Sequence, residues 1–428
     1  MKRSTYNSVI PLGSGLSLLY NAVSDEFLVF KNGLLDKEWN PESLGTQLYD
    51  RLKQGEFIID EDVDEKQRYI DKSIRKLETD RNFHIIVNPT LQCNFRCWYC
   101  YEEHLPSKMD ESTVSGVKNL IGTLAKQGKN VTLSFFGGEP LIYYAEIMKP
   151  LIEYANTVCN ENGVGFETNA TSNGFLFTKP VIEELRANNF KYVQITLDGN
   201  EEQHNKVRHT ADGLGSYKRI VSNICLLAQN GIEIILRFNY TPDNINGIKD
   251  VAQEFAHLSG AERGRIHVSL HRVWQEEDVE PVVLEQAISA YTQLGIDAKP
   301  TLFGDFCYGD KPNSIVVNFN GDLYKCTAVD FFNTPRDGYI SSDGSLHWEN
   351  GSLEKRLSMI FSNAECQTCR IFPLCHGGCS TWHIKSPDGY CILDYNDEKK
   401  DDVILQRFLF NLRSKRHWQS MLLKTEKP

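Results

Sequence analysis

Cysteine placement constrains this chain more than any other feature of its sequence. Three of its twelve cysteines lie between positions 93 and 100, seven more lie between 307 and 391, and only Cys159 and Cys225 stand apart. The first residues, MKRSTYNSVIPLGSG, lack an apolar signal-peptide core, so we expect a cytoplasmic protein. Disulfides seldom persist in that compartment, where clustered cysteines are more often metal ligands or catalytic groups. The two groups therefore predict metal-binding segments, whereas Cys159 and Cys225 are predicted to be buried thiols.

Charge and hydropathy exclude two classes of partner. The formal net charge is −11 and the pI is about 5.6, so we expect neither a nucleic acid nor an anionic membrane surface to bind the chain. No run of 18 or more apolar residues is present, so no membrane span is predicted.

The 428 residues exceed one ordinary core, and changes in pattern divide them into four parts. Short alternating strands followed by amphipathic helices predict a small α+β module over residues 1–80. Alternating strand and helix patterns occupy residues 81–298, and turns rich in Gly, Asp, Asn and Cys occupy residues 299–395. Residues 396–428 return to a helical pattern.

The middle part predicts a parallel sheet with an outer layer of helices. Its strands are expected at 84–89, 131–136, 165–171, 192–197, 232–240 and 266–273, with helices at 111–126, 145–162, 181–188, 217–230 and 245–257. Polar motifs follow several of these strands, which favours a partial (β/α)6 TIM-like barrel because such barrels carry their active residues at the carboxyl ends of the strands.

The first group of cysteines has the spacing CxxxCxxC, at Cys93, Cys97 and Cys100, directly after the first barrel strand. Three thiolates on one tight loop ligate three corners of a [4Fe–4S] cube and leave one iron open, because clusters normally take four protein ligands. The alternative is a zinc site, but structural zinc usually uses paired CxxC units and four protein ligands.

This segment resembles the radical S-adenosylmethionine (radical SAM) superfamily. The resemblance covers about residues 83–295 and implies an oxidoreductase in which S-adenosylmethionine chelates the open iron. In that family an electron from the cluster cleaves the cofactor and produces a 5′-deoxyadenosyl radical, which abstracts hydrogen from the substrate. The protein supplies orientation and exclusion while the cofactor carries the chemistry.

Further motifs of the resemblance imply contacts with the cofactor. The segment from Phe136 to Pro140 resembles the GGEP motif, and the segment from Thr196 to Arg208 resembles SLDG…R, with Thr in place of the usual Ser and His204 where Asp is common. The implied cofactor-binding residues are Tyr99, Gly137, Gly138, Glu139, Pro140, Ser172, Asn173, Thr196, Arg208 and Leu270.

The later cysteines resemble the SPASM domain, which holds auxiliary iron–sulfur clusters. The pattern is Cys307, then Gly321-x4-Cys326, then Cys366-x2-Cys369-x5-Cys375-x3-Cys379, and finally Cys391. The resemblance implies that Cys366, Cys369, Cys375 and Cys391 bind one [4Fe–4S] cluster, and that Cys307, Cys326 and Cys379 bind a second, whose fourth ligand is open. A pair of zinc knuckles is the alternative.

Radical SAM enzymes with SPASM domains mostly modify peptides or proteins. The resemblance therefore implies maturation of a ribosomally made precursor peptide, by a thioether or carbon–carbon crosslink or by epimerisation. Residues 1–80 resemble the module of such maturases that binds the leader peptide as an added strand, although a plain packing domain is the alternative. An electron donor such as flavodoxin or ferredoxin is a further implied partner.

Two other functions stay open at this point. An anaerobic sulfatase maturase oxidises a Cys or Ser of a protein, but that family carries Asp directly after the GxxxxC cysteine, where this chain has Thr327, with Asp330 further on. A non-catalytic electron carrier or binding scaffold is the second. No catalytic acid or base is assigned. The nearby candidates are Tyr101, His104, Asp198, His204 and His271.

Overall fold

The computed structural model divides the chain into two compact units. It describes residues 1–35, 40–41, 44–273, 275–277, 279–300, 303–386 and 389–413. Unit one comprises Met1–Thr79, Leu302–Pro312 and Glu354–Pro428, and unit two comprises Asp80–Thr301 and Asn313–Leu353. The four-part division expected from the sequence stays a prediction.

Unit two is built on one sheet with the strand order β12-β11-β10-β9-β8-β7-β6-β13-β14-β15-β16. Neighbouring strands from β12 through β13 run parallel, and those from β13 through β16 run antiparallel. The strands are β6 Asn82–Val87, β7 Asn130–Phe135, β8 Phe166–Ser172, β9 Phe190–Leu197, β10 Glu233–Tyr240, β11 Ile266–Arg272, β12 Asp297–Pro300, β13 Ser314–Val317, β14 Asp322–Tyr324, β15 Gly338–Ile340 and β16 Leu346–Trp348.

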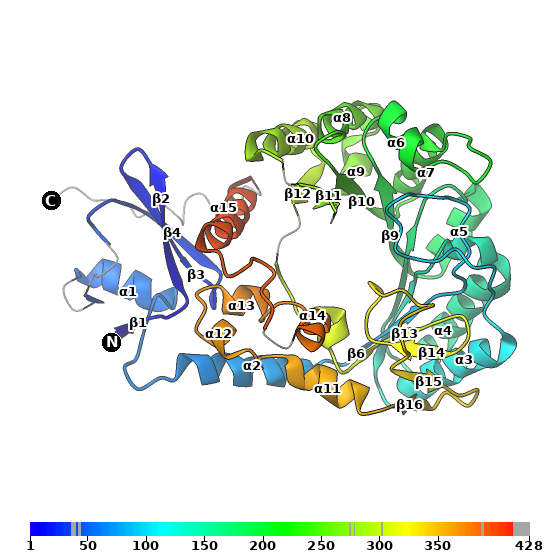
Figure 1. Cartoon of the computed structure of the whole chain (residues 1–428), viewed down its shortest axis with the longest axis horizontal. Coiled ribbons are helices and arrows are strands. Elements are labelled where there is room, and N and C mark those ends of the chain that lie inside the picture. Colours follow the sequence, from blue (N-terminus) through cyan, green and yellow to red (C-terminus); the bar gives the residue numbers. More distant parts are fainter. Residues whose placement is uncertain are drawn as a thin grey trace. The chain divides into compact units, whose positions relative to one another are not determined.

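Amphipathic helices alternate with these strands and lie along one side of them (Figure 1). They are α3 Glu111–Lys126, α4 Lys149–Glu161, α5 Lys179–Ala187, α6 Glu201–Val207, α7 Tyr217–Gln229, α8 Ile245–Val251, α9 Gly260–Arg263 and α10 Pro281–Gln293. Their apolar faces and the strands form one continuous core, which includes Val87, Leu133, Val193 and Leu236. The predicted partial barrel is therefore confirmed, and each of its six predicted strands overlaps one of β6–β11.

The segment expected as a single helix at 145–162 is divided. Residues Tyr144–Met148 form a π-helical turn, and α4 begins only at Lys149. Pro150 lies in the first turn of α4, where its missing N–H needs no helical partner, and this position favours a helix start there. Local proline chemistry thus moves the boundary that hydrophobic periodicity alone predicted.

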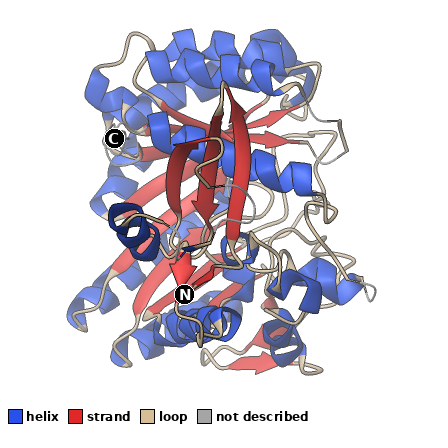
Figure 2. Ribbon diagram, turned by 90° about the vertical axis from the view of Figure 1, so that its left-hand side faces the viewer, coloured by secondary structure: helices blue, strands red, loops and turns tan. Residues whose placement is uncertain are grey.

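Unit one joins both ends of the chain. Strands β2 Asn7–Gly13, β3 Leu16–Asn21 and β4 Glu26–Lys31 form an antiparallel sheet (Figure 2), and β1 Lys2–Arg3 pairs with β5 Ile58–Ile59. Its helices are α1 Thr46–Gln54, α2 Glu65–Thr79, α11 Ser352–Met359 (which begins at the boundary between the units), α12 Ala364–Gln367, α13 Phe372–Cys375, α14 Ser380–Lys385 and α15 Asp397–Arg413.

The N-terminal sheet and the cysteine-rich segment share one core. Tyr20, Phe27, Phe372, Ile404 and Phe408 are buried together in it. The helix expected over 396–428 is present as α15, and residues 414–428 lie outside the described part of the chain. No helix within the described ranges is long and apolar enough to cross a membrane.

Candidate active site

The CxxxCxxC cysteines lie on the loop that follows β6. Cys93 and Cys97 pack against the core of unit two, whereas Cys100 is exposed. Buried Phe95 pairs with Thr210, and the Asn94 carbonyl accepts a hydrogen bond of 3.1 Å from the Ala211 amide. The loop is therefore held against the chain segment that follows α6.

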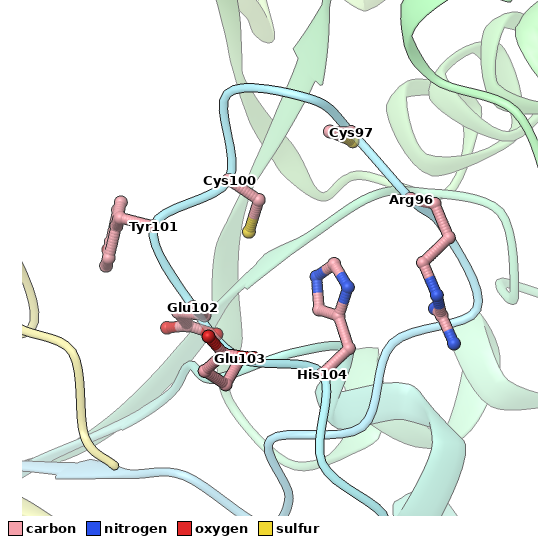
Figure 3. Close-up of a pocket in the computed structure, with 7 residues that line it drawn as sticks. All are labelled: Arg96, Cys97, Cys100, Tyr101, Glu102, Glu103 and His104. Carbon is pink, nitrogen blue, oxygen red and sulfur yellow. The ribbon is translucent and has the colours of Figure 1, made fainter. Parts of the chain in front are cut away.

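A pocket of about 270 Å³ opens beside this loop. Figure 3 shows the Cys100 thiol and the His104 ring pointing toward each other across it. Its lining residues are Arg96, Cys97, Cys100, Tyr101, Glu102, Glu103 and His104. The pocket thus places two of the predicted cluster ligands beside ionisable side chains.

The three thiols fit a cluster that has three protein ligands. Burial raises the pKa of Cys93 to about 12 and that of Cys100 to about 11, and it also raises the pKa of Cys97. The charge of Cys97 raises the pKa of the other two further, so the three thiols lie within electrostatic reach of one another. Iron binds thiolates, so cluster assembly here must displace protons.

No three His, Cys, Asp or Glu side chains within the described ranges are placed to hold a single metal ion. A [4Fe–4S] cube makes a different demand, because each thiolate binds a different iron atom.

The GGEP segment docks on the residues that lead into Cys93. The Gly138 amide donates to the Thr90 carbonyl at 3.1 Å, and the Glu139 amide donates to the Gln92 carbonyl at 2.9 Å. A Cβ on Gly138 would lie 2.4 Å from the carbonyl oxygens of both Leu91 and Gln92, so only glycine fits there. The motif therefore positions the cysteine loop through its backbone.

Glu139 is fully buried and accepts three hydrogen bonds from protein donors. Its Oε1 accepts hydrogen bonds from the Ser172 hydroxyl at 2.9 Å and from the Leu141 amide at 3.1 Å, and its Oε2 accepts one from the Asn173 amide at 2.7 Å. Burial raises the pKa of this carboxyl to about 7, while the Asn173 amide opposes that shift. The sequence alone implied a contact with the cofactor ammonium group. That contact stays a prediction, and the structure adds a role in joining β7 to β8.

Asn173 connects this carboxylate to the cysteine loop. Its side-chain amide donates to the Asn94 side-chain oxygen at 2.7 Å and lies 3.9 Å from the Cys93 sulfur. Pro140 is buried at the start of a 3-10 turn, Pro140–Tyr143, for which the Glu139 side chain is the cap. Four of the predicted cofactor residues (Gly138, Glu139, Ser172 and Asn173) thus belong to one hydrogen-bonded assembly, with Gly137 and Pro140 next to it in the sequence.

Tyr99 is the centre of a second assembly, at the carboxyl ends of β9 and β10. Its hydroxyl donates to Asp198 Oδ2 at 2.6 Å and accepts from Arg208 at 2.8 Å and from the Asn239 side chain at 3.2 Å. Arg237 donates to Asn239 at 2.7 Å, and Thr196 pairs with Arg237 across the two strands. The structure therefore brings Tyr99 and Arg208 into contact and places Thr196 on the neighbouring strand, opposite Arg237.

Of two further predicted residues, Leu270 lies apart from these assemblies, whereas His204 is joined to the second one. Leu270 is buried in the core between sheet and helices, while its neighbours Ser269 and His271 are only partly buried and bond to each other at 2.9 Å. His204 is buried, and its Nδ1 accepts a hydrogen bond of 3.3 Å from the Asp198 amide. Its Nε2 lies 2.9 Å from the Ser216 hydroxyl, which donates to the Arg208 carbonyl. Burial lowers the pKa of His204 well below its usual range, and that of His271 to about 3, so both rings are neutral.

Sequence reasoning missed Glu102. Its Oε1 is buried without a hydrogen-bond partner, and burial together with the charge of Asp330 raises its pKa to about 8. Asp330 lies on the segment after Cys326, and the Tyr101 hydroxyl donates to the Thr327 carbonyl at 3.1 Å. The only available signal was the position of Glu102 beside Cys100, because its proximity to Asp330 depends on the pairing of β6 with β13.

The predicted ligands of one auxiliary cluster lie together in unit one. Burial raises the pKa of Cys375 to about 12, and the charges of Cys369, Cys366 and Cys391 raise it further. Burial, followed by the charges of Cys391 and Cys369, raises the pKa of Cys366 to about 11. The four thiols therefore lie within electrostatic reach of one another, and their ligand role stays a prediction.

The second predicted set is divided between the units. Cys307 and Cys379 belong to unit one and Cys326 to unit two, so this set also stays a prediction. Within unit one, the buried Arg356 guanidinium donates to the Gly309 carbonyl at 2.8 Å and to Thr381 at 2.7 Å, and it lies 3.4 Å from Asp310. Arg356 thereby joins the segments that follow Cys307 and Cys379.

The isolated cysteines are buried, as predicted: Cys159 is 0% and Cys225 is 8% exposed.

Comparison with known proteins finds similarity to one family over part of the chain. The sequence pattern of the Radical SAM superfamily matches residues 87–255. A cysteine-type anaerobic sulfatase-maturating enzyme of Clostridium novyi is 22% identical over 70% of this chain and 88% of its own length. The radical SAM cyclopropyl synthase TigE of Paramaledivibacter caminithermalis is 26% identical over 76% of this chain and 74% of its own length. Streptococcus suis SuiB, solved bound to its precursor peptide SuiA, shares the fold with a TM-score of 0.52 at 15% identity, over 90% of this chain and 97% of that chain.

Proposed function

Since this chain belongs to the radical SAM superfamily of enzymes, we propose that it modifies a ribosomally made precursor peptide by radical chemistry. The observation that carries the proposal is the meeting of three thiols with two buried polar assemblies at the carboxyl ends of β6–β10. That edge is where barrels of this type carry their chemistry.

We assign the cofactor-binding roles as follows. Cys93, Cys97 and Cys100 hold a [4Fe–4S] cluster, and Arg208 receives the carboxylate of S-adenosylmethionine. When bound, cluster and cofactor supply a 5′-deoxyadenosyl radical that abstracts hydrogen from the substrate. Glu139 and Asn173 hold the cysteine loop in place, because Asn173 contacts both Glu139 and Asn94.

The cofactor proposal has a direct test with a matched control. The anaerobically purified protein, supplied with S-adenosylmethionine and dithionite, should release 5′-deoxyadenosine. Cys97→Ala should abolish this release, whereas Cys225→Ala, which removes a buried thiol from α7, should retain it. Equal release by the two variants would contradict the assignment of Cys97 as a cluster ligand.

The proposed substrate is a peptide, and the proposed product contains a thioether or carbon–carbon crosslink. TigE and the complex of SuiB with SuiA support a peptide substrate. In our proposal two auxiliary clusters, held by the cysteines of the 307–391 segment, take up the electron left after bond formation. Twelve cysteines without a disulfide among the described residues suit the reducing cytoplasm, where flavodoxin or ferredoxin can donate electrons.

Anaerobic coexpression with candidate precursor peptides tests the reaction. Loss of two hydrogens from the peptide mass, located by fragmentation to a pair of residues, is the expected result. An unchanged mass with one deuterium gained in heavy water would instead establish epimerisation. A peptide that changes in neither way would contradict its assignment as the substrate.

The sheet β2-β3-β4 offers an edge for a leader peptide. Both β2 and β4 are edge strands, but β2 contains Pro11 and an irregular register between Pro11 and Gly13, which are features that discourage strand addition. We therefore assign the leader to β4. Hydrogen exchange with and without precursor peptide should show new protection over Glu26–Lys31 and none over Asn7–Gly13, and the reverse pattern would contradict this assignment.

Oxidation of a protein cysteine or serine is the second candidate function. The similarity to the Clostridium novyi sulfatase-maturating enzyme favours it, as does a carboxylate pair, Glu102 and Asp330, beside the cysteine loop. Thr327 stands where that family carries its Asp, which weighs against it. Formation of formylglycine in a sulfatase-motif peptide would establish this function in place of peptide crosslinking.

A further inference from the structure

The hydroxyl of Tyr99 lies between the two members of a buried ion pair. Arg208 and Asp198 Oδ2 are 4.0 Å apart, too far for a direct hydrogen bond, and their side chains are only 10% and 1% exposed. The hydroxyl contacts both of them, at 2.8 Å from Arg208 and 2.6 Å from Asp198. An ion pair in a buried setting is thus held apart by a neutral group.

Both charged partners keep an unused hydrogen-bonding atom. Asp198 Oδ1 and Arg208 Nε are buried and have no hydrogen-bond partner. A buried polar atom without a hydrogen-bond partner lowers the stability of the fold. Arg208 Nε is a donor and Asp198 Oδ1 is an acceptor, so the two atoms could satisfy each other. A shift of about 1 Å would bring the guanidinium and the carboxylate into direct contact.

The spacer itself is held rigidly. A phenol donates one hydrogen bond and accepts two, and Tyr99 makes all three, since it also accepts from Asn239. Asn239 presents its amide nitrogen to Tyr99 because Arg237, which carries donors only, bonds to its oxygen. Phe95 lies beneath the Arg208 guanidinium, with its ring centre 5.9 Å away, and supports it from another side.

We propose that the Tyr99 hydroxyl is a spacer that prevents Asp198 from capturing Arg208, and that it thereby keeps the guanidinium available to the carboxylate of S-adenosylmethionine. The second half of this inference rests on the proposed function. Tyr99 is a positioning residue in this role, and it acts through its hydroxyl.

Removal of the hydroxyl alone tests the spacer. In Tyr99→Phe the guanidinium should close onto Asp198, and a crystal structure of the variant should show direct contact in place of the 4.0 Å gap. Calorimetry on the reconstituted protein measures the dissociation constant for S-adenosylmethionine. This constant should rise about 10- to 100-fold, because Arg208 would lose its charged hydrogen bond to the cofactor carboxylate.

A second substitution separates this effect from general damage. In Tyr99→Phe combined with Asp198→Asn, the competing charge is absent, so binding should recover by at least about half of the loss on a logarithmic scale. The matched control is Tyr144→Phe, which removes a hydroxyl that bonds to Glu184 at 3.0 Å beside the Lys149–Glu184 pair in the helical layer. Its binding of S-adenosylmethionine should equal that of the wild type.

Each result decides a different part of the inference. An unchanged gap in the Tyr99→Phe crystal structure, wild-type binding by that variant, or no recovery in the double variant would overturn the spacer. A wild-type protein that does not bind S-adenosylmethionine would overturn the proposed function and the proposal that Arg208 receives the cofactor carboxylate. The crystal structure of Tyr99→Phe would still show whether the hydroxyl keeps Asp198 and Arg208 apart.

Discussion

Adding one methyl group at Gly138 should dislodge the loop that carries Cys93. In Gly138→Ala the new Cβ would lie 2.4 Å from two backbone carbonyl oxygens, of Leu91 and Gln92, whereas a carbon and a carbonyl oxygen normally stay about 3.3 Å apart. Neither oxygen is the end of a flexible side chain, so the backbone itself must move by about 1 Å.

This movement has a calculable cost. It weakens the hydrogen bonds from Gly138 to Thr90 and from Glu139 to Gln92, each worth about 1 kcal/mol, and overpacking of this kind adds about 1–3 kcal/mol. The free energy of unfolding should therefore fall by about 3–5 kcal/mol. For a unit of this size the midpoint of thermal unfolding should fall by roughly 6–20 °C.

Calorimetry and the iron content of anaerobically reconstituted protein measure the two consequences. Gly260→Ala is the matched control, because no heavy atom lies within 4 Å of its added Cβ. The control should keep the melting temperature and the iron content of the wild type. Gly138→Ala should melt at a lower temperature and bind less iron. If Gly138→Ala melts within about 2 °C of the control and binds the same iron, close backbone approach is not the reason for glycine at this position.

Three further substitutions test polar groups of the fold. Glu139→Gln should lower the free energy of unfolding by about 1–3 kcal/mol in calorimetry, because an amide nitrogen would face one of the donors that the carboxylate now satisfies. The nearby carboxylates of Asp297 and Glu233, at 3.9 Å and 3.0 Å from the ring nitrogens, raise the pKa of His267. The stabilising effect of His267 should therefore be complete below about pH 6.5 and lost as the pH rises through its folded pKa. The difference in the free energy of unfolding between wild type and His267→Gln should therefore shrink from pH 6 to pH 8. The change should be less than about 1 kcal/mol because His267 is 40% exposed. A difference that grows with pH would show that the direction predicted here is wrong. Arg356→Met should cost about 3–5 kcal/mol by stranding buried Asp310, and adding Asp310→Asn should recover part of it, so a double variant no more stable than the single one would exclude the ion pair as the cause.

The barrel was predictable because its information is local. Apolar periodicity located β6–β11 and the helices α3, α4, α5, α7 and α8, but not α6, α9 or α10. Helix α3 begins and ends where that pattern predicted. Strands β12 and β13 were missed because they are short and lie in a region dominated by turn residues. What makes them strands is pairing with β11 and β6, which lie far away or across a helix in the sequence.

The candidate site divides in the same way. The spacing of Cys93, Cys97 and Cys100, and the glycines of the GGEP segment, are written in adjacent residues. The partners of Tyr99 are not, since Asp198, Arg208 and Asn239 reach it from other strands and loops. The sequence implied only that Tyr99 contacts the cofactor, and the structure shows that its hydroxyl makes three hydrogen bonds.

By itself, the sequence determined the chemistry that this protein carries: a three-thiol loop after the first barrel strand, a second cysteine-rich segment, and the alternating units that support them. Ligand spacing and periodicity are properties of neighbouring residues, so they survive in a linear string. Tertiary structure alone decided which carboxylates are buried, which charges are held apart, and that the N-terminal sheet shares a core with Cys366. Those features arise from contacts between segments that are not adjacent in the sequence. Burial, which sets their energies, is a property of the folded chain.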